Sequence, residues 1–180
     1  RRDQPHPAQD ASGAPRSHAG TASHRGAYQG NVRYSYLTLR ERIGRLANGL
    51  SRLGVETGST VAMMDWDSHR YLECFFAVPM MGAVLQTVNV RLSPDQILYT
   101  LNHAGAEVLL VNSEFFPILA QIAPALEHVR QFIVFSDEAT MPTPPVAADA
   151  EYESLLADSD SEFDFPDFDE NAQATTFYTT

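Results

Sequence analysis

The central part of the chain alternates between stretches with helical periodicity and short apolar runs. In the first helical stretch, leucine and isoleucine recur every three or four residues from Leu39 to Leu53, which is the spacing of one buried helix face. Thr38 and Glu41 have the spacing of a capping box that would begin this helix, and Gly54 stands where a glycine commonly ends one. We therefore expect a helix that packs on a core through a single face.

Similar signals mark the elements that follow. Ser93, Pro94 and Gln96 supply a capping serine, a proline at the first helical position and a glutamine three residues after the cap, and Gly105 then stops the helix. Ser68, or the aspartate before it, can cap another helix. The expected strands are 59–65, 84–90, 107–111, 131–135 and 174–179, and the expected helices are 38–53, 68–81, 93–104, 114–126 and 152–157.

The order of these elements predicts the fold class. Helices and strands that alternate at this spacing are joined by right-handed crossovers, so we expect an α/β fold with a largely parallel sheet flanked by helices. Residues 136–150 are expected to form a surface linker. Residues 1–30 are rich in Pro, Gly, Ala, Ser, His and Arg with a single aromatic residue, Tyr28, and cannot bury enough apolar surface to offset their ordering entropy. We expect them to be disordered and residues 31–180 to form the ordered part.

Charge is distributed unevenly along the chain. The net charge is −11, every basic residue is an arginine, and residues 131–180 carry twelve of the 23 acidic residues without a single basic one. An acidic, base-free segment repels phosphate backbones, so no nucleic-acid partner is expected. Because the chain contains no lysine, it can complete neither a lysine-bearing phosphate loop nor a Schiff base.

Cys74, the sole cysteine, lies in an apolar run that extends to about Leu85. A lone cysteine in such a run indicates a small buried side chain, excludes an internal disulfide and fits a reducing compartment, so we expect a cytoplasmic protein. The run is too short to cross a bilayer and contains Pro79 and Gly82, so no transmembrane segment is expected.

We searched the sequence for loops that bind nucleotide phosphates or calcium. The chain has neither a G-x-G-x-x-G motif nor a complete P-loop, so a self-contained dinucleotide-binding module is not expected. The acidic stretch 158–164 resembles a calcium-binding loop but has Phe163 where that loop needs glycine. A solvated acidic loop held to the body by Phe163, Phe165 and Phe168 is the favoured interpretation.

The histidines give no clear site. His69 follows the carboxyl end of an expected strand, where ligands of parallel sheets gather, and could line a cleft, although packing at the helix start is favoured. His69, His103 and His128 fall on three different elements without ligand spacing, so no metal site is expected among them. Ser68, His69 and the neighbouring aspartates are too close in sequence for a hydrolase triad, and no G-x-S-x-G elbow is present.

Four segments, in order, resemble the adenylate-forming (AMP-binding) superfamily, which joins acyl-CoA synthetases, luciferases and peptide-synthetase adenylation domains. They are Tyr-Leu-Thr-Leu at 36–39, Gly-Val-Glu-Thr-Gly-Ser-Thr-Val-Ala at 54–62, Met-Gly-Ala and Asn-Val-Arg-Leu between 81 and 92, and Phe-Tyr-Thr-Thr at 177–180. The last resembles the opening of the family's phosphate loop. Trp-Asp-Ser-His-Arg-Tyr at 66–71, together with the Tyr-Thr-Thr form of that opening, looks most like bacterial medium- or long-chain fatty acyl-CoA synthetases.

The resemblance implies part of the N-terminal domain of a ligase that uses ATP and Mg²⁺ to form an acyl-adenylate from a fatty acid, and then transfers the acyl group to coenzyme A. It assigns Thr179 and Thr180 to the ATP phosphates and Thr179 also to Mg²⁺, and it assigns no catalytic residue, because the loop glycines, the loop lysine and the later motifs are not in this sequence. We therefore expect a fragment truncated before the phosphate loop and inactive by itself. Full-length relatives often pair, which adds a homodimer to the expected partners.

One alternative stays open on the residues alone. A free-standing, non-catalytic α/β module could bind a partner through its acidic C-terminal segment. The coding sequence after Thr180 distinguishes the two, because a glycine-rich continuation with a lysine favours the ligase and a stop codon favours the module.

Overall fold

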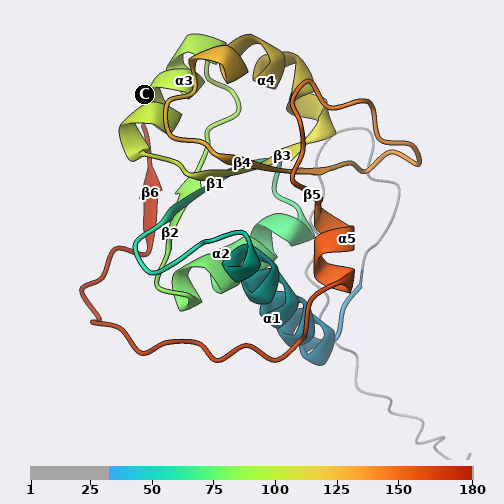
Figure 1. Cartoon of the computed structure of the whole chain (residues 1–180), viewed down its shortest axis with the longest axis vertical. Coiled ribbons are helices and arrows are strands. Elements are labelled where there is room, and N and C mark those ends of the chain that lie inside the picture. The colour runs from blue at the N-terminus through green and yellow to red at the C-terminus, as the bar shows by residue number, and fades with distance from the viewer. Residues whose placement is uncertain (1–32, 180) are drawn as a thin grey trace, which may run out of the picture.

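The computed structural model describes residues 33–179, which form one parallel six-stranded sheet with helices on both faces (Figure 1). The expected α/β class and the parallel sheet are therefore confirmed, since all five strand pairs run parallel. The disorder expected for residues 1–30 concerns residues outside the described range, so it stays a prediction, as does the domain boundary at residue 31.

The sheet has the strand order β5-β4-β3-β1-β2-β6. Its strands are β1 (Thr60–Met64), β2 (Val84–Thr87), β3 (Val108–Asn112), β4 (Gln131–Phe135), β5 (Ala150–Glu151) and β6 (Thr175–Phe177). The helices are α1 (Tyr36–Arg52), α2 (His69–Met80), α3 (Pro94–Ala104), α4 (Phe116–Ile122) and α5 (Tyr152–Ala157), with single 3₁₀ turns η1 (Ser113–Phe115) and η2 (Ala123–Ala125) on either side of α4.

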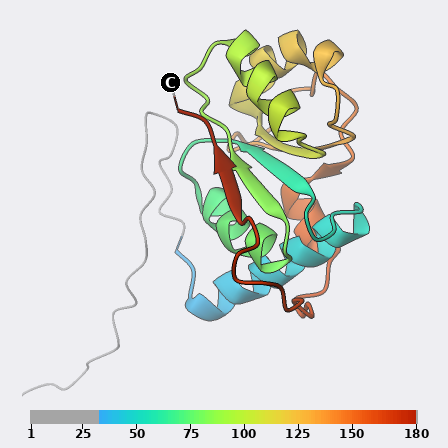
Figure 2. The same ribbon diagram turned by 90° about the vertical axis from the view of Figure 1, so that its left-hand side faces the viewer.

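Each face of the sheet packs against its helices through a separate apolar core. Helices α1, α2 and α5 cover one face and α3 and α4 the other, as the two ribbon views show (Figures 1 and 2). Successive strand residues alternate between the cores, so that in β1 Val61 and Met63 face α1 and α2 while Ala62 and Met64 face α3 and α4. The central strands β1 and β3 are buried along their whole length, as expected for strands covered on both faces.

Helix α1 begins earlier than the sequence pattern predicted. Ser35 is the N-cap, and its side chain accepts a hydrogen bond from the Thr38 amide at 3.0 Å, so the predicted capping box of Thr38 and Glu41 is wrong. The added first turn contains Tyr36 and Leu37, which are 82% and 64% exposed and so do not extend the buried stripe that marks the rest of the helix.

The predicted helix ends and the second capping box are confirmed. Gly54 and Gly105 both have positive φ angles, 88° and 66°, where a side chain would be strained. Both hydrogen bonds of the Ser93 and Gln96 capping box are present. Ser68 rather than the aspartate before it caps α2.

The helix predicted over 114–126 is divided into three parts. Asn112 caps the η1 turn, α4 follows, and η2 completes the segment. Pro117 and Pro124 each lie in a first turn because proline has no amide hydrogen to donate further inside a helix. Ala150, the last residue of the predicted linker, and the following Glu151 pair with β4 as the short strand β5.

Residues 158–174 carry the chain from α5 to β6 at the opposite edge of the sheet, passing outside α1 (Figure 1). Three side chains of α1 donate hydrogen bonds to this segment's backbone carbonyl groups: Arg45, Asn48 and Arg52. Phe163 and Phe165 pack on the core beneath α1, which confirms two of the three predicted aromatic anchors, whereas Phe168 remains 46% exposed.

Cys74 is fully buried and free, as predicted for a small core side chain. Of the helices formed by residues 33–179, none has both the length and the apolar character that a membrane crossing requires.

Candidate functional site

The carboxyl ends of all six strands lie at one edge of the sheet because the strands are parallel. Polar side chains follow β1, β3, β4 and β6 at this edge. The chain leaves β1 toward β2 through α2 on one face and reaches β3 through α3 on the other, so the strand order reverses between β1 and β3. In open α/β sheets ligands bind at such a reversal point, which makes this edge the candidate site.

Asp65, which follows β1, and Asn112, which ends β3, form the buried centre of the edge. The Asn112 amide donates hydrogen bonds to Asp65 at 2.9 Å and to Asp137, which follows β4, at 3.0 Å. The Ser68 hydroxyl donates to the other Asp65 oxygen and accepts the Tyr71 amide hydrogen at 3.2 Å. Burial raises the pKa of Asp65 to about 6 against the opposing effect of the hydrogen bonds from Ser68 and Asn112.

A cluster of charged residues continues from this centre under α1, α2 and α5; we call Arg42, Arg70, Glu73, Asp137 and Glu153 the charge cluster. Arg70 pairs with Asp137 at 2.8 Å and with Glu153 at 3.1 Å. Arg42 pairs with Glu153 at 2.9 Å and with Glu73 at 2.6 Å. Each arginine thus joins two carboxylates from different elements, which fixes the helices relative to one another.

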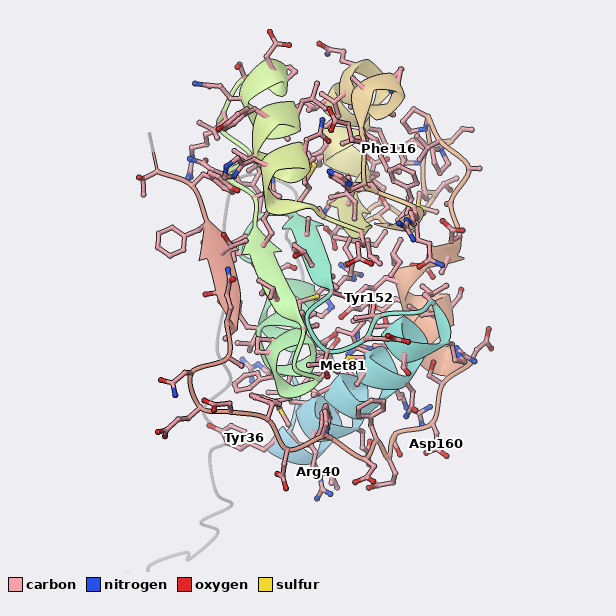
Figure 3. All side chains as sticks on the ribbon, turned by 60° about the vertical axis from the view of Figure 1, so that its left-hand side comes forward. Tyr36, Arg40, Met81, Phe116, Tyr152 and Asp160 are labelled. Carbon is pink, nitrogen blue, oxygen red and sulfur yellow. The ribbon has the colours of Figure 1, made fainter. Side chains whose placement is uncertain are left out.

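Tyr152 closes the inner end of the charge cluster. It is fully buried on the face of the sheet that carries α1, where Figure 3 labels it, and its hydroxyl donates to Glu73 at 2.6 Å. Burial and the negative charge of Glu73 raise the pKa of Tyr152 well above its ordinary value, so it keeps its proton. Burial alone would raise the pKa of Glu153, but the His69 ring 3.8 Å away and the hydrogen bonds from Arg42 hold it well below its ordinary value.

A second, more exposed group lies over the ends of β1 and β3. The Trp66 indole N–H donates to Glu114 at 2.7 Å, and the Trp66 ring packs against Phe115 with centroids 5.4 Å apart. The Arg91 guanidinium lies 5.6 Å from the Trp66 ring centroid, in cation–π geometry. These contacts fix a partly exposed aromatic ring beside an arginine at the reversal point of the sheet.

The end of β6 is the third part of the edge and carries the residues that the sequence assigned to ATP. Thr179, two residues after the end of β6, is exposed, and Thr180 lies outside the described residues. Tyr178, between β6 and Thr179, shares a 2.8 Å hydrogen bond with His103 of α3. An exposed hydroxyl fits one donor to a phosphate oxygen or one oxygen ligand of Mg²⁺, so Thr179 fits one corner of such a site.

Other residues singled out from the sequence have structural roles. The His69 ring packs edge-on against Tyr34 at 5.6 Å and lies 3.8 Å from Glu153, which supports packing at the helix start. Because Ser68 bonds Asp65 while His69 points to other partners, the three do not form a triad. Among residues 33–179 no group of three or more His, Cys, Asp or Glu side chains is arranged to hold a metal ion.

The charge cluster and the contact between Tyr178 and His103 were not predicted from the sequence. One local signal was present on α2. The charged residues Arg70 and Glu73 lie directly beside Tyr71 and Cys74, and all four are buried. Charged residues in a buried helical stretch need partners, although their spacing does not say which ones.

Residues 14–180 match the protein family described as AMP-binding enzyme. The chain belongs to this family. It is 44% identical over 107 residues to a long-chain-fatty-acid–CoA ligase of Thermus thermophilus, covering 59% of this chain and 20% of that protein. It is 32% identical over 139 residues to a medium-chain-fatty-acid–CoA ligase of Ectopseudomonas oleovorans, covering 77% of this chain and 26% of that protein.

The fold is shared with a solved CoA ligase. A long-chain-fatty-acid–CoA ligase from Archaeoglobus fulgidus superimposes with a TM-score of 0.72 at 19% sequence identity, over 88% of this chain and 30% of that structure. The chain therefore spans a third or less of the length of these relatives.

Proposed function

We propose that these residues belong to an ATP-dependent fatty acid–CoA ligase that forms AMP. The observation that carries the proposal is the position of Thr179: it lies at the carboxyl edge of a parallel sheet, two residues after β6, in a chain of the AMP-binding family. Relatives named as long- and medium-chain ligases support a fatty acid as the substrate.

In this reaction the fatty acid carboxylate attacks the α-phosphate of ATP, giving the acyl-adenylate and pyrophosphate. The thiol of coenzyme A then attacks the acyl carbon and AMP leaves. Bound Mg²⁺ would balance phosphate charge. Thr179 and Thr180 would donate hydroxyl and backbone hydrogen bonds to the phosphates, and the Thr179 hydroxyl would also face the metal.

The 180-residue chain by itself is proposed to be inactive. It contains no lysine, and the glycine-rich turn that would surround the phosphates does not occur in it. Without these groups the charge of the leaving pyrophosphate is not neutralised, and electrostatic stabilisation of that kind supplies much of the rate in phosphoryl chemistry.

Fatty-acid-dependent exchange of radiolabelled pyrophosphate into ATP tests both statements. The 180-residue chain should show no exchange above a buffer blank with octanoate, laurate or palmitate. The polypeptide made from the complete reading frame that contains it should show exchange. Exchange by the 180-residue chain would overturn the proposed inactivity, and a reading frame that ends at Thr180 or yields no exchange would overturn the proposed ligase.

A matched pair of variants tests the role of Thr179 in that polypeptide. Thr179→Val removes the hydroxyl while keeping the shape, and exchange should fall by about tenfold or more, as when one donor to a developing charge is lost. Thr175→Val makes the same change at an exposed position of β6 and should leave exchange unaltered. Equal rates for the two variants would refute the assignment.

The alternative of an interaction module with an acidic C-terminal segment is less well supported. Family membership favours the ligase, and the backbone of 158–162 is bound to α1 through Arg45, Asn48 and Arg52. A reducing, cytoplasmic location is proposed from the single, buried, unpaired Cys74. The homodimer stays a prediction of the resemblance, and sedimentation of the polypeptide from the complete reading frame would test it.

A further inference from the structure

An aromatic and imidazole cluster joins the end of β6 to α3. The His103 Nδ1 atom and the Tyr178 hydroxyl are 2.8 Å apart, and their rings meet edge to face with centroids 5.7 Å apart. Tyr99, one turn earlier on α3, stacks on His103 at 5.4 Å with an interplanar angle of 24°. We call Tyr99, His103 and Tyr178 the α3–β6 cluster. His103 and Tyr178 are 75 residues apart along the chain but adjacent in space.

Strand β6 has few other means of staying in place. It is three residues long, lies at the edge of the sheet and, among residues 33–179, pairs with β2 alone. Phe177, its one large apolar side chain, is 67% exposed, so burial of β6 contributes little. Within residues 33–179, the contact between His103 and Tyr178 is the one side-chain hydrogen bond that joins residues 174–179 to another helix or strand.

The neighbouring position on β2 adds to this weakness. Gln86 pairs in register with Thr176 of β6 and is fully buried, yet neither polar atom of its side chain has a hydrogen-bond partner among the described residues. A buried amide without a partner destabilises its surroundings. The seam between β2 and β6 is therefore held less firmly than those between the central strands.

Helix α3, in contrast, is firmly fixed. Its first turn is closed by the capping box at Ser93, and Ile97 and Leu101 are fully buried against the sheet. From this fixed helix His103 hydrogen-bonds Tyr178, and Tyr99 stacks on His103. Because His103 belongs to this fixed helix, its hydrogen bond to Tyr178 restrains the residue that directly precedes Thr179.

The two polar atoms of the contact have definable roles. Burial and the nearby Tyr99 hydroxyl raise the pKa of Tyr178, so the phenol keeps its proton and can donate it. A neutral imidazole accepts at one ring nitrogen and donates at the other. In the tautomer that carries its proton on Nε2, the His103 Nδ1 atom accepts the hydrogen bond from the Tyr178 hydroxyl.

We propose that His103 is a positioning residue that acts through Tyr178: it holds the end of β6 against α3 and so sets the direction in which the chain enters the phosphate-binding segment at Thr179. The role of the residues after Tyr178 rests on the proposed function, whereas the contact and its effect on β6 do not.

Hydrogen exchange and nitrogen NMR on the 180-residue chain test the structural part. His103→Ala and Tyr178→Phe should each speed amide exchange in β6 by about fivefold to tenfold while leaving β1 and β3 unchanged. His103→Asn keeps an acceptor near the position of Nδ1 and should restore part of the protection. His128→Ala, which removes an exposed histidine whose charged neighbour is Glu127 rather than Tyr178, is the matched control and should match the wild type.

The ring spectrum gives an independent readout. Tyr178→Phe should shift the His103 Nδ1 resonance and leave that of His128 unchanged. Unaltered β6 exchange in His103→Ala, or an unaltered Nδ1 resonance in Tyr178→Phe, would overturn the proposal.

The functional part is measured in the polypeptide from the complete reading frame. His103→Ala should raise the KM for ATP several-fold with a smaller change in the KM for the fatty acid, and His103→Asn should recover part of the loss. Equal changes in both KM values would overturn a role in directing Thr179. If the wild-type polypeptide forms no acyl-adenylate, the proposed function fails, and the exchange experiment on β6 still decides whether His103 holds the strand.

Discussion

Neutralising Glu73 should destabilise the fold far more than neutralising a surface carboxylate. Glu73 has no exposed surface, and its carboxylate accepts hydrogen bonds from Arg42 Nε at 2.6 Å, from Arg42 Nη2 at 3.2 Å and from the Tyr152 hydroxyl at 2.6 Å. These three bonds join α2 to α1 and to α5. Glu73→Gln keeps the shape of the side chain and removes the charge, so it isolates the electrostatic part of the contact.

The magnitude follows from what the substitution leaves behind. Breaking a buried ion pair by removing one charge costs roughly 3–5 kcal/mol, because the other charge stays buried without compensation. Arg42 retains Glu153, with bonds of 2.9 and 3.0 Å, and glutamine can still accept one hydrogen bond. We therefore expect the lower end of the range, about 3 kcal/mol.

The chain supplies its own control. Arg40 and Glu162 also join α1 to another segment, but their side chains are 78% and 82% exposed and 3.8 Å apart. Surface pairs of this kind contribute roughly 0–1 kcal/mol, so Glu162→Gln should change the free energy of unfolding by less than about 0.5 kcal/mol.

Urea unfolding at pH 7, followed by far-ultraviolet circular dichroism and by the fluorescence of Trp66, measures both variants. The slope of the unfolding free energy against urea should be unchanged, so that midpoints compare directly. Glu73→Gln within about 1 kcal/mol of the wild type, or equal to Glu162→Gln, would refute the claim that the buried pair holds the helices together. Adding Arg42→Gln to Glu73→Gln should cost less than the sum of the two single changes by about 1 kcal/mol or more, since the second change removes the stranded charge.

Three further predictions concern other parts of the fold. Because burial raises the pKa of Asp65 to about 6, the stability that its protonated form contributes is fully present below the ordinary pKa of 3.8 and is lost as pH rises through 6. Between pH 4 and pH 7 the free energy of unfolding of the wild type should therefore fall by up to about 3 kcal/mol relative to Asp65→Asn, and parallel pH profiles for the two proteins would refute this. Gly44→Ala would place a Cβ atom 1.8 Å from the Ser161 carbonyl oxygen, so we expect a loss of about 2 kcal/mol in urea unfolding and faster proteolysis after residue 157; unchanged proteolysis would contradict it. Phe75 and Phe76, 46% and 45% exposed on α2, should promote self-association, and replacing both with serine should lower the sedimentation-average mass of the 180-residue chain; an unchanged mass would contradict it.

The elements that could be predicted from the sequence are those whose signals are local. The capping box at Ser93, the glycines at 54 and 105 and the mainly apolar runs of β1 and β3 each act within a few residues, and each is found as expected. The parallel sheet follows from the alternation of these elements, because right-handed crossovers leave few other arrangements. The first turn of α1 was missed since its exposed Tyr36 and Leu37 do not belong to the apolar stripe.

The candidate site depends on contacts between distant residues, which local signals do not determine. Three parallel strands end at the same edge, and this brings together Asp65, Asn112 and Asp137. The fold class predicts a ligand site at that edge, but it does not predict that the Asn112 amide donates hydrogen bonds to both aspartates. Arg42 meets Glu73 and Glu153 only when α1, α2 and α5 have packed on the same face. A buried arginine indicates that it has a partner, and the choice of partner is set by the packing.

Thr179 combines both kinds of information. Its sequence context predicts its chemistry, but its position depends on three features of the folded chain: the segment 158–174 that crosses outside α1, the pairing of β6 with β2, and the bond between His103 and Tyr178. The first two place β6 at the edge of the sheet without restraining the residues beyond it. Because a phosphate-binding segment must start from a defined point for its backbone amides to converge on an anion, the third feature is the one whose loss should alter ATP binding while leaving the sheet intact.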